Sequence, residues 1–153
     1  MSTFDAVRRP GAAAAAPGAA RPSLPSAAPA TAVRVLAAAA LAANIAIHVY
    51  LAPDHLKEMP YIGVSFVIAA ILLTGVLIGL VFQPRESWPW LTGAALSLGM
   101  AVLFVVSRTF GLPDYHEAWT SDSALGLWCL VPEAIFLACA ATVLPAIRRW
   151  DGL

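Results

Sequence analysis

Four long apolar stretches, separated by short polar segments, dominate the pattern of hydrophobic and polar positions along this chain. They cover approximately residues 31–52, 61–82, 88–110 and 123–147. Each is close to the ~20 residues that an α-helix needs to cross ~30 Å of hydrocarbon. A soluble core does not require four such stretches in a chain of 153 residues. The pattern therefore predicts a multi-pass membrane protein with four transmembrane helices.

The segments between the apolar stretches are short and contain residues that favour a reversal of the chain. Pro53 is expected to end the first helix, and the loop 53–60 is bracketed by prolines. Residues 83–87 form the second connection and residues 111–122 the third. Short connections place sequential helices side by side. The predicted fold class is all-α, an integral membrane antiparallel four-helix bundle over residues 31–150.

Residues 1–30 differ in composition from the rest, because they consist mainly of Ala, Pro, Gly and Ser with a few Arg. Five prolines interrupt any helix that the alanines could start. Such a segment cannot bury enough apolar area to offset the entropy of ordering, so a disordered cytoplasmic tail is predicted. A cleaved signal peptide is the less favoured alternative, since the apolar run that follows is itself of membrane length.

Composition and charge strengthen the membrane prediction and set an orientation. The chain is 60% hydrophobic and 12% charged, about half the charged fraction of a soluble domain. Its net charge is zero, which argues against a nucleic-acid partner. One side of the bundle holds Arg8, Arg9, Arg21, Arg34, Arg85, Arg148 and Arg149, and the other holds Lys57 and Arg108. The positive-inside rule then predicts cytoplasmic N- and C-termini in a cell-membrane protein.

Small residues indicate where helices approach closely. Gly75 and Gly79 form a GxxxG pair in the second stretch, and Gly93, Ser97 and Ala101 repeat every fourth residue in the third. Small side chains at these intervals let a neighbouring backbone come near in a membrane. Both sets are therefore expected at helix–helix contacts.

Two segments carry a resemblance to a known group of proteins. The sequence HLKEMPYIG at residues 55–63 and the sequence SRTFGLP at residues 107–113 resemble segments of uncharacterised small four-helix integral membrane proteins of actinobacteria. The resemblance covers roughly residues 35–147. It implies the same bacterial membrane topology and draws attention to these two segments, but it implies no chemistry.

Asn44, His48, Arg108 and Glu133 are the candidate polar site. Counted from the predicted outer helix ends, His48 lies ~8 Å deep, Asn44 ~13 Å and Glu133 ~15 Å, and the long Arg108 side chain can reach inward. Charged groups at such depths are costly in a bilayer and need partners. We expect the four residues to share one polar layer with Glu133 pointing into the bundle. That layer is either a structural clamp or the lining of a small outward-facing pocket.

His55, Glu58, His116 and Glu117 are candidate ligands in the outer loops. Their atoms suit zinc or copper, but their spacing matches no known metal pattern, and no metal site is predicted. No cofactor is predicted either, because a bis-histidine haem needs a second intramembrane histidine besides His48. The two cysteines, at positions 129 and 139, would lie ~15 Å apart on one helix, too far for a disulfide.

The sequence contains no nucleophile elbow, catalytic triad pattern or phosphate-binding loop. The favoured interpretation is a structural or accessory subunit in the lipid bilayer, paired with another membrane protein or with further copies of itself. One alternative is a binding or transport module with a pocket for a proton, metal ion or small ligand. Another is a membrane-embedded enzyme.

Overall fold

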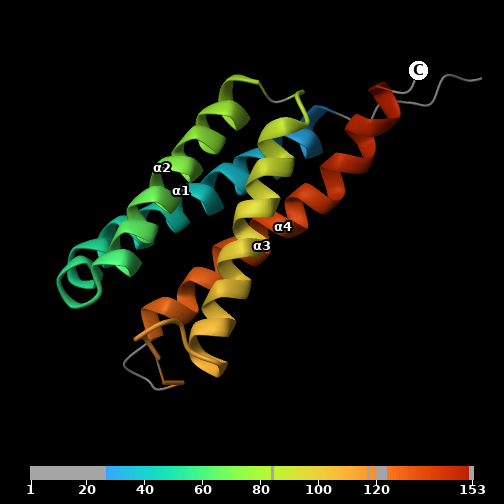
Figure 1. Ribbon diagram of the computed structural model, residues 1–153. Helices are drawn as coiled ribbons and strands as arrows, with labels where there is room; N and C mark the ends of the chain where they lie inside the picture. Colours follow the sequence, from blue (N-terminus) through green and yellow to red (C-terminus); the bar gives the residue numbers. More distant parts are fainter. Residues whose placement is uncertain (1–26, 84, 117, 120–123, 152–153) are drawn as a thin grey trace, which may run out of the picture.

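Four α-helices make up nearly all of the chain that the structure describes (Figure 1). The computed structural model describes residues 27–83, 85–116, 118–119 and 124–151. The helices are α1 (Ala27–Glu58), α2 (Pro60–Phe82), α3 (Trp88–Thr109) and α4 (Ala124–Asp151). All four are long and apolar enough to cross a membrane. The prediction of an all-α fold with four membrane-length helices is confirmed.

The first helix does not end where the sequence pattern placed its end. α1 runs through Pro53 and continues to Glu58, so the prediction that Pro53 ends this helix is wrong. A proline inside a helix removes one backbone hydrogen bond, here the one to the carbonyl oxygen of Val49, but leaves the others available. The last turn is closed by the Met59 N–H, which donates to the His55 carbonyl oxygen at 2.8 Å.

The other helix boundaries lie close to the predicted ones. α2 and α3 agree with the predicted stretches within one residue, whereas α4 continues beyond residue 147 to Asp151. α1 begins at Ala27 and therefore includes residues 27–30, the last residues of the predicted tail. The remainder of the predicted tail, residues 1–26, lies outside the described residues.

A single residue, Met59, connects α1 to α2. Its backbone is extended (φ −141°, ψ 90°), and Pro60 follows as the first residue of α2, a position that proline favours. The reversal brings Gly63 against the backbone of Leu56, where an added Cβ would clash. Glycine at position 63 therefore allows the first turn of α2 to lie directly against the last turns of α1.

The connection from α3 to α4 begins with a tight turn. Leu112 and Tyr115 exchange two backbone hydrogen bonds of 2.6 and 2.9 Å, and Gly111 (φ 79°) and Asp114 (φ 57°) adopt left-handed backbone conformations. The Tyr61 hydroxyl at the start of α2 donates to the Pro113 carbonyl oxygen. Residues 110–116 and Met59 therefore lie at the same end of the bundle, here named the Met59 end. The opposite end, which holds Gln83 and residues 85–87, is named the Gln83 end.

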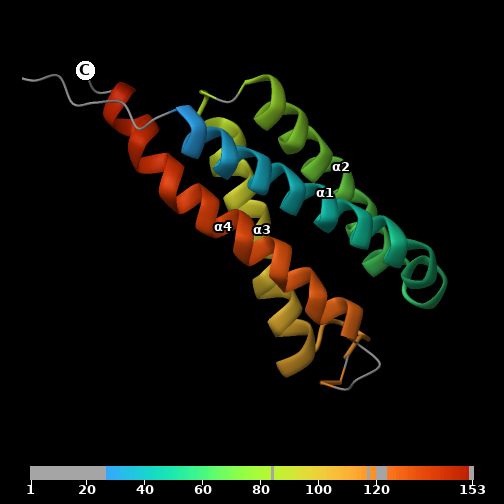
Figure 2. The same cartoon turned by 180° about the vertical axis from the view of Figure 1, so that it is seen from behind.

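Each helix packs against the next one in sequence, and α1 also packs against α4 (Figures 1 and 2). The α1–α2 and α1–α4 contacts are the most extensive. The largest side chains of the core are Leu41 from α1, Leu73, Val76 and Leu80 from α2, Trp90 from α3 and Phe136 from α4. The Trp90 and Phe136 rings are stacked with 5.9 Å between centroids. This core lies between the middle of the bundle and the Gln83 end.

Large apolar side chains are exposed on every helix, for example Val49 on α1, Ile71 on α2, Leu98 on α3 and Val131 on α4. Between 22% and 33% of the residues in the most apolar part of each helix are buried, so most of each helix faces outward. Leaving apolar area in water costs about 25 cal/mol per Å². A surface of this kind is compatible with a membrane protein.

Gly93 and Gly99 offer a matched test of the packing on α3. An added Cβ at Gly93 would lie 2.5 Å from the Phe136 ring, whereas one at Gly99 would meet nothing within 4 Å. We expect Gly93→Ala to lower the free energy of unfolding by about 1–3 kcal/mol, the usual effect of overpacking, and Gly99→Ala to leave it unchanged or raise it. Thermal unfolding of both variants in detergent measures the difference. Equal stability of the two variants would contradict the Gly93–Phe136 contact.

Candidate functional site

Glu133 of α4 and Asn44 of α1 form a buried polar pair. Their side chains are 3% and 2% exposed. The Asn44 side chain hydrogen-bonds to the Glu133 carboxyl group. Because Asn44 Oδ1 has no hydrogen-bond partner among the described residues, the Asn44 amide nitrogen is the donor. The structure thus places Glu133 inside the bundle, facing α1.

Arg108 lies at the α3–α4 contact near the Met59 end, and its side chain is buried. Its guanidinium lies over the Phe104 ring at 4.1 Å from the centroid and 5.8 Å from the Trp119 centroid. Nη1 donates to the Ala118 carbonyl oxygen at 3.3 Å. Nη2 lies 2.7 Å from the position that a Cβ on Gly126 would take. The glycine of α4 therefore makes room for the arginine of α3.

Arg108 and Glu133 occupy different depths in the bundle. Gly126, against which the guanidinium lies, is seven residues from Glu133 on α4, a separation of ~10 Å along the helix. Cys129, which is buried, lies between them on the same face of α4, three residues from Gly126 and four from Glu133. The candidate residues therefore form a column that runs inward from the Met59 end, and Arg108 stands above the layer that holds Glu133.

His48 faces α2. Its Nδ1–H donates to the backbone carbonyl oxygen of Asn44 at 3.0 Å, and its ring lies 5.1 Å from the Phe66 ring. His55, two turns along α1, repeats this arrangement: Nδ1–H donates to the Leu51 carbonyl oxygen at 2.9 Å, and the ring stacks on Phe66 at 4.7 Å. Two histidine rings therefore hold one phenylalanine between α1 and α2. The sequence pattern does not predict that His48 and His55 both contact an aromatic ring, and it contains no signal for Phe66 as their partner.

The described candidates of the outer loops besides His55 are exposed and do not belong to the buried column. Glu58 is exposed at the end of α1, and His116 is exposed beside Gly111. Glu117 lies outside the described residues. No group of three His, Cys, Asp or Glu side chains comes together as a metal site within the residues that the structure describes.

Ser97 of α3 is a further polar residue of the interior. Its side chain is fully buried, and its hydroxyl has no hydrogen-bond partner among the described residues. The sequence pattern grouped Ser97 with Gly93 and Ala101 as small packing residues. The only feature of the sequence that indicates a polar role for position 97 is the serine hydroxyl, because glycine or alanine would suffice for close helix packing.

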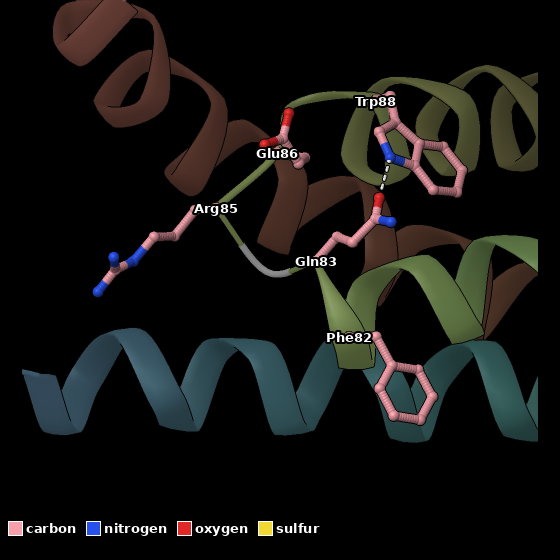
Figure 3. Close-up of a pocket in the computed structure, with 5 residues that line it drawn as sticks. All are labelled: Phe82, Gln83, Arg85, Glu86 and Trp88. Carbon is pink, nitrogen blue, oxygen red and sulfur yellow. Dashed lines mark hydrogen bonds between the residues drawn. The ribbon is translucent and has the colours of Figure 1, made fainter.

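Two hollows lie away from the polar column. One, of 660 Å³, is at the Gln83 end and is lined by Phe82, Gln83, Arg85, Glu86 and Trp88 (Figure 3). There the Trp88 Nε1–H donates to Gln83 Oε1 at 2.7 Å. The other, of 520 Å³, is an apolar groove between α1 and α2 lined by residues such as Ile45, Val49 and Ile71. Neither hollow reaches Glu133, so neither corresponds to the outward-facing pocket of the sequence hypothesis.

Comparison with known proteins adds no assignment to this geometry. No protein-family model, curated protein or solved structure matches the chain.

The Glu133–Asn44 pair predicts a specific order of stability among variants. Glu133→Leu removes the acceptor for the Asn44 amide and should lower the free energy of unfolding by about 1–3 kcal/mol. Glu133→Gln keeps a carbonyl acceptor and should cost less. Glu58→Leu, at an exposed position, serves as the control and should have little effect. Thermal unfolding in detergent ranks the three variants, and a Glu133→Leu protein as stable as Glu58→Leu would contradict the pair.

Proposed function

We propose that this chain is a multi-pass integral protein of the cell membrane, an antiparallel four-helix bundle that acts as a structural or accessory subunit. The four membrane-length helices and their outward-facing apolar side chains support insertion in a lipid bilayer. The resemblance of residues 55–63 and 107–113 to four-helix membrane proteins of actinobacteria supports the same topology.

The charge distribution supports an orientation with both termini in the cytoplasm. Arg85 lies in the turn before α3, and Arg34 lies near the start of α1. Both arginines therefore belong to the Gln83 end. The positive-inside rule assigns the end richer in Arg and Lys to the cytoplasm. Lys57 at the Met59 end is paired with Asp54 at 3.2 Å, with both side chains exposed. The Met59 end is then the outer end.

The observation that carries the accessory role is a pair of outward-facing glycines. Gly75 on α2 and Gly99 on α3 are exposed, and a Cβ at either would meet nothing within 4 Å. Glycine in a helix interior costs ~1 kcal/mol relative to alanine, and neither position needs it for the internal packing of this chain. Small residues on a lipid-facing surface allow the backbone of another transmembrane helix to approach. We infer that these faces contact a partner helix.

A binding or transport module is the second candidate function. The buried Glu133 carboxyl group favours it, because ionisable residues inside membrane helices commonly mark sites and pathways.

The proposed topology is tested with single cysteines at positions 57 and 87 in a background that carries Cys129→Ala and Cys139→Ala. We expect an impermeant maleimide added outside intact cells to label the Lys57→Cys protein but not the Ser87→Cys protein, because the two positions lie at opposite ends of the bundle. Permeabilised cells provide the control, in which both should be labelled. Outside labelling at position 87 alone would invert the orientation.

The accessory role is tested by size and composition after purification in mild detergent. We expect a complex larger than the monomer, made of further copies or a co-purifying membrane protein. Gly75→Leu should weaken the association about tenfold, which is ~1.4 kcal/mol, and Gly75→Ala should weaken it less because alanine is still small. Both variants should keep the stability of the isolated bundle. A protein that purifies as a monomer, with no further copies and no co-purifying membrane protein, would refute the accessory role.

A further inference from the structure

Three buried oxygen atoms in the middle of the bundle have no hydrogen-bond partner among the described residues. They are Asn44 Oδ1, Ser97 Oγ and Glu133 Oε2. Their side chains come from α1, α3 and α4. Buried polar atoms are normally satisfied, so each such atom in a native structure calls for an explanation.

The register of α3 against α4 is fixed by two contacts. Gly93 faces the Phe136 ring, which lies 2.5 Å from the position of an added Cβ. Eleven residues further along α3, Phe104 Cε2 lies 3.1 Å from the corresponding position on Gly126. Residue numbers therefore rise along α3 while they fall along the facing side of α4, at nearly equal steps.

This register brings the three residues that carry these oxygen atoms to one level along the bundle. Four residues on from Gly93 is Ser97, and the facing position on α4, four residues back from Phe136, is position 132, next to Glu133. Asn44 joins the same level from α1 through its hydrogen bond to Glu133. Asn44, Ser97 and Glu133 thus form one layer across the bundle, here named the oxygen layer.

Apolar packing closes the oxygen layer toward the Gln83 end. Leu41 and Phe136 lie one turn beyond Asn44 and Glu133, and both are buried in the core with Val76. Toward the Met59 end, the next groups on the inner face of α4 are Cys129 and Gly126. The column already described, which ends at Arg108, therefore lies between the oxygen layer and the Met59 end.

Pro132 adds a backbone oxygen near this layer. This proline lies inside α4 and is buried. It has no N–H to donate to the carbonyl oxygen of Trp128, one turn toward the Met59 end. α4 continues through Pro132, so the helix leaves this one carbonyl oxygen without its usual backbone donor, and such oxygens can coordinate cations in membrane proteins.

We propose that the oxygen layer binds a single Na⁺ ion. A carboxylate, an amide oxygen, a hydroxyl and a backbone carbonyl are hard ligands, which suit alkali and alkaline-earth cations rather than soft metals. The layer contains one carboxylate, Glu133, so a monovalent cation neutralises it, whereas a divalent ion leaves an excess positive charge in the hydrocarbon. The ion also explains the three oxygen atoms that lack protein donors. This inference does not depend on the accessory role.

The test uses the purified full chain in lipid nanodiscs, with Na⁺ as the probe. We expect NaCl, exchanged against choline chloride at constant ionic strength, to raise the unfolding temperature in a saturable way, because Na⁺ binds the folded state. Ser97→Ala should raise the Na⁺ concentration at half-effect about fivefold to tenfold through the loss of one ligand. Ser107→Ala is the matched control and should not change it, since Ser107 is a buried serine of α3 whose hydroxyl donates to the Phe104 carbonyl oxygen at 2.8 Å.

Direct binding keeps the proposal falsifiable if a variant fails to fold. Equilibrium binding of radioactive Na⁺ to the unmodified chain should saturate at one ion per chain and should be lost in Glu133→Gln. The proposal is overturned if the unmodified chain shows no saturable Na⁺ binding, if choline stabilises it as well as Na⁺, or if Ser97→Ala and Ser107→Ala respond alike. Each of these results leaves the association measured for the accessory role unaffected.

Discussion

A carboxyl group inside an apolar bundle places the strictest condition on this structure. Burying an ionised carboxylate without a partner costs several kcal/mol, and in hydrocarbon no water is at hand to offset that cost. The Asn44 amide meets the condition by donating to Glu133, and it can do so only when α1 and α4 are in one register. Leu41 and Phe136 enter the core in that same register. Sliding α4 by one turn would break the hydrogen bond and the core packing together.

Glycines set how closely the other helices approach. Gly63 lets the start of α2 meet the backbone of Leu56, and Gly93 accepts the face of the Phe136 ring. Neither contact leaves space for a Cβ, so each fixes a helix pair at short distance. Gly75 and Gly99 are the same residue type in the same kind of helix, yet they face outward with open space around them. All four residues are glycines, so the residue type does not decide their role. The face of the helix on which each lies decides whether it permits close internal packing or leaves an open surface.

The two proposals concern different parts of the molecule. The accessory role depends on the outer surface, where apolar side chains and open glycines suit lipid and a partner helix. The proposed Na⁺ site depends on the interior, where Asn44, Ser97 and Glu133 each bury an oxygen atom that has no hydrogen-bond partner among the described residues. Arg108 lies between this interior and the Met59 end, where it contacts the Phe104 and Trp119 rings and the Ala118 carbonyl oxygen. A cation bound in the oxygen layer would strengthen the bundle without altering the surface that a partner meets.

Helix number and approximate helix ends could be predicted from the sequence alone, because hydropathy and length are local properties and each stretch is by itself long and apolar enough to span a membrane. The need of Glu133 for a partner could also be read, since burying a charge is costly in any arrangement. Only the tertiary structure decided that Asn44 is the partner of Glu133, that the His48 ring faces Phe66, and that the Ser97 hydroxyl is fully buried. The physical reason is that nearly uniform apolar helices carry little periodicity to say which face turns inward. Rotation and register are then set by the simultaneous packing of all four helices, which also holds α1 helical through Pro53.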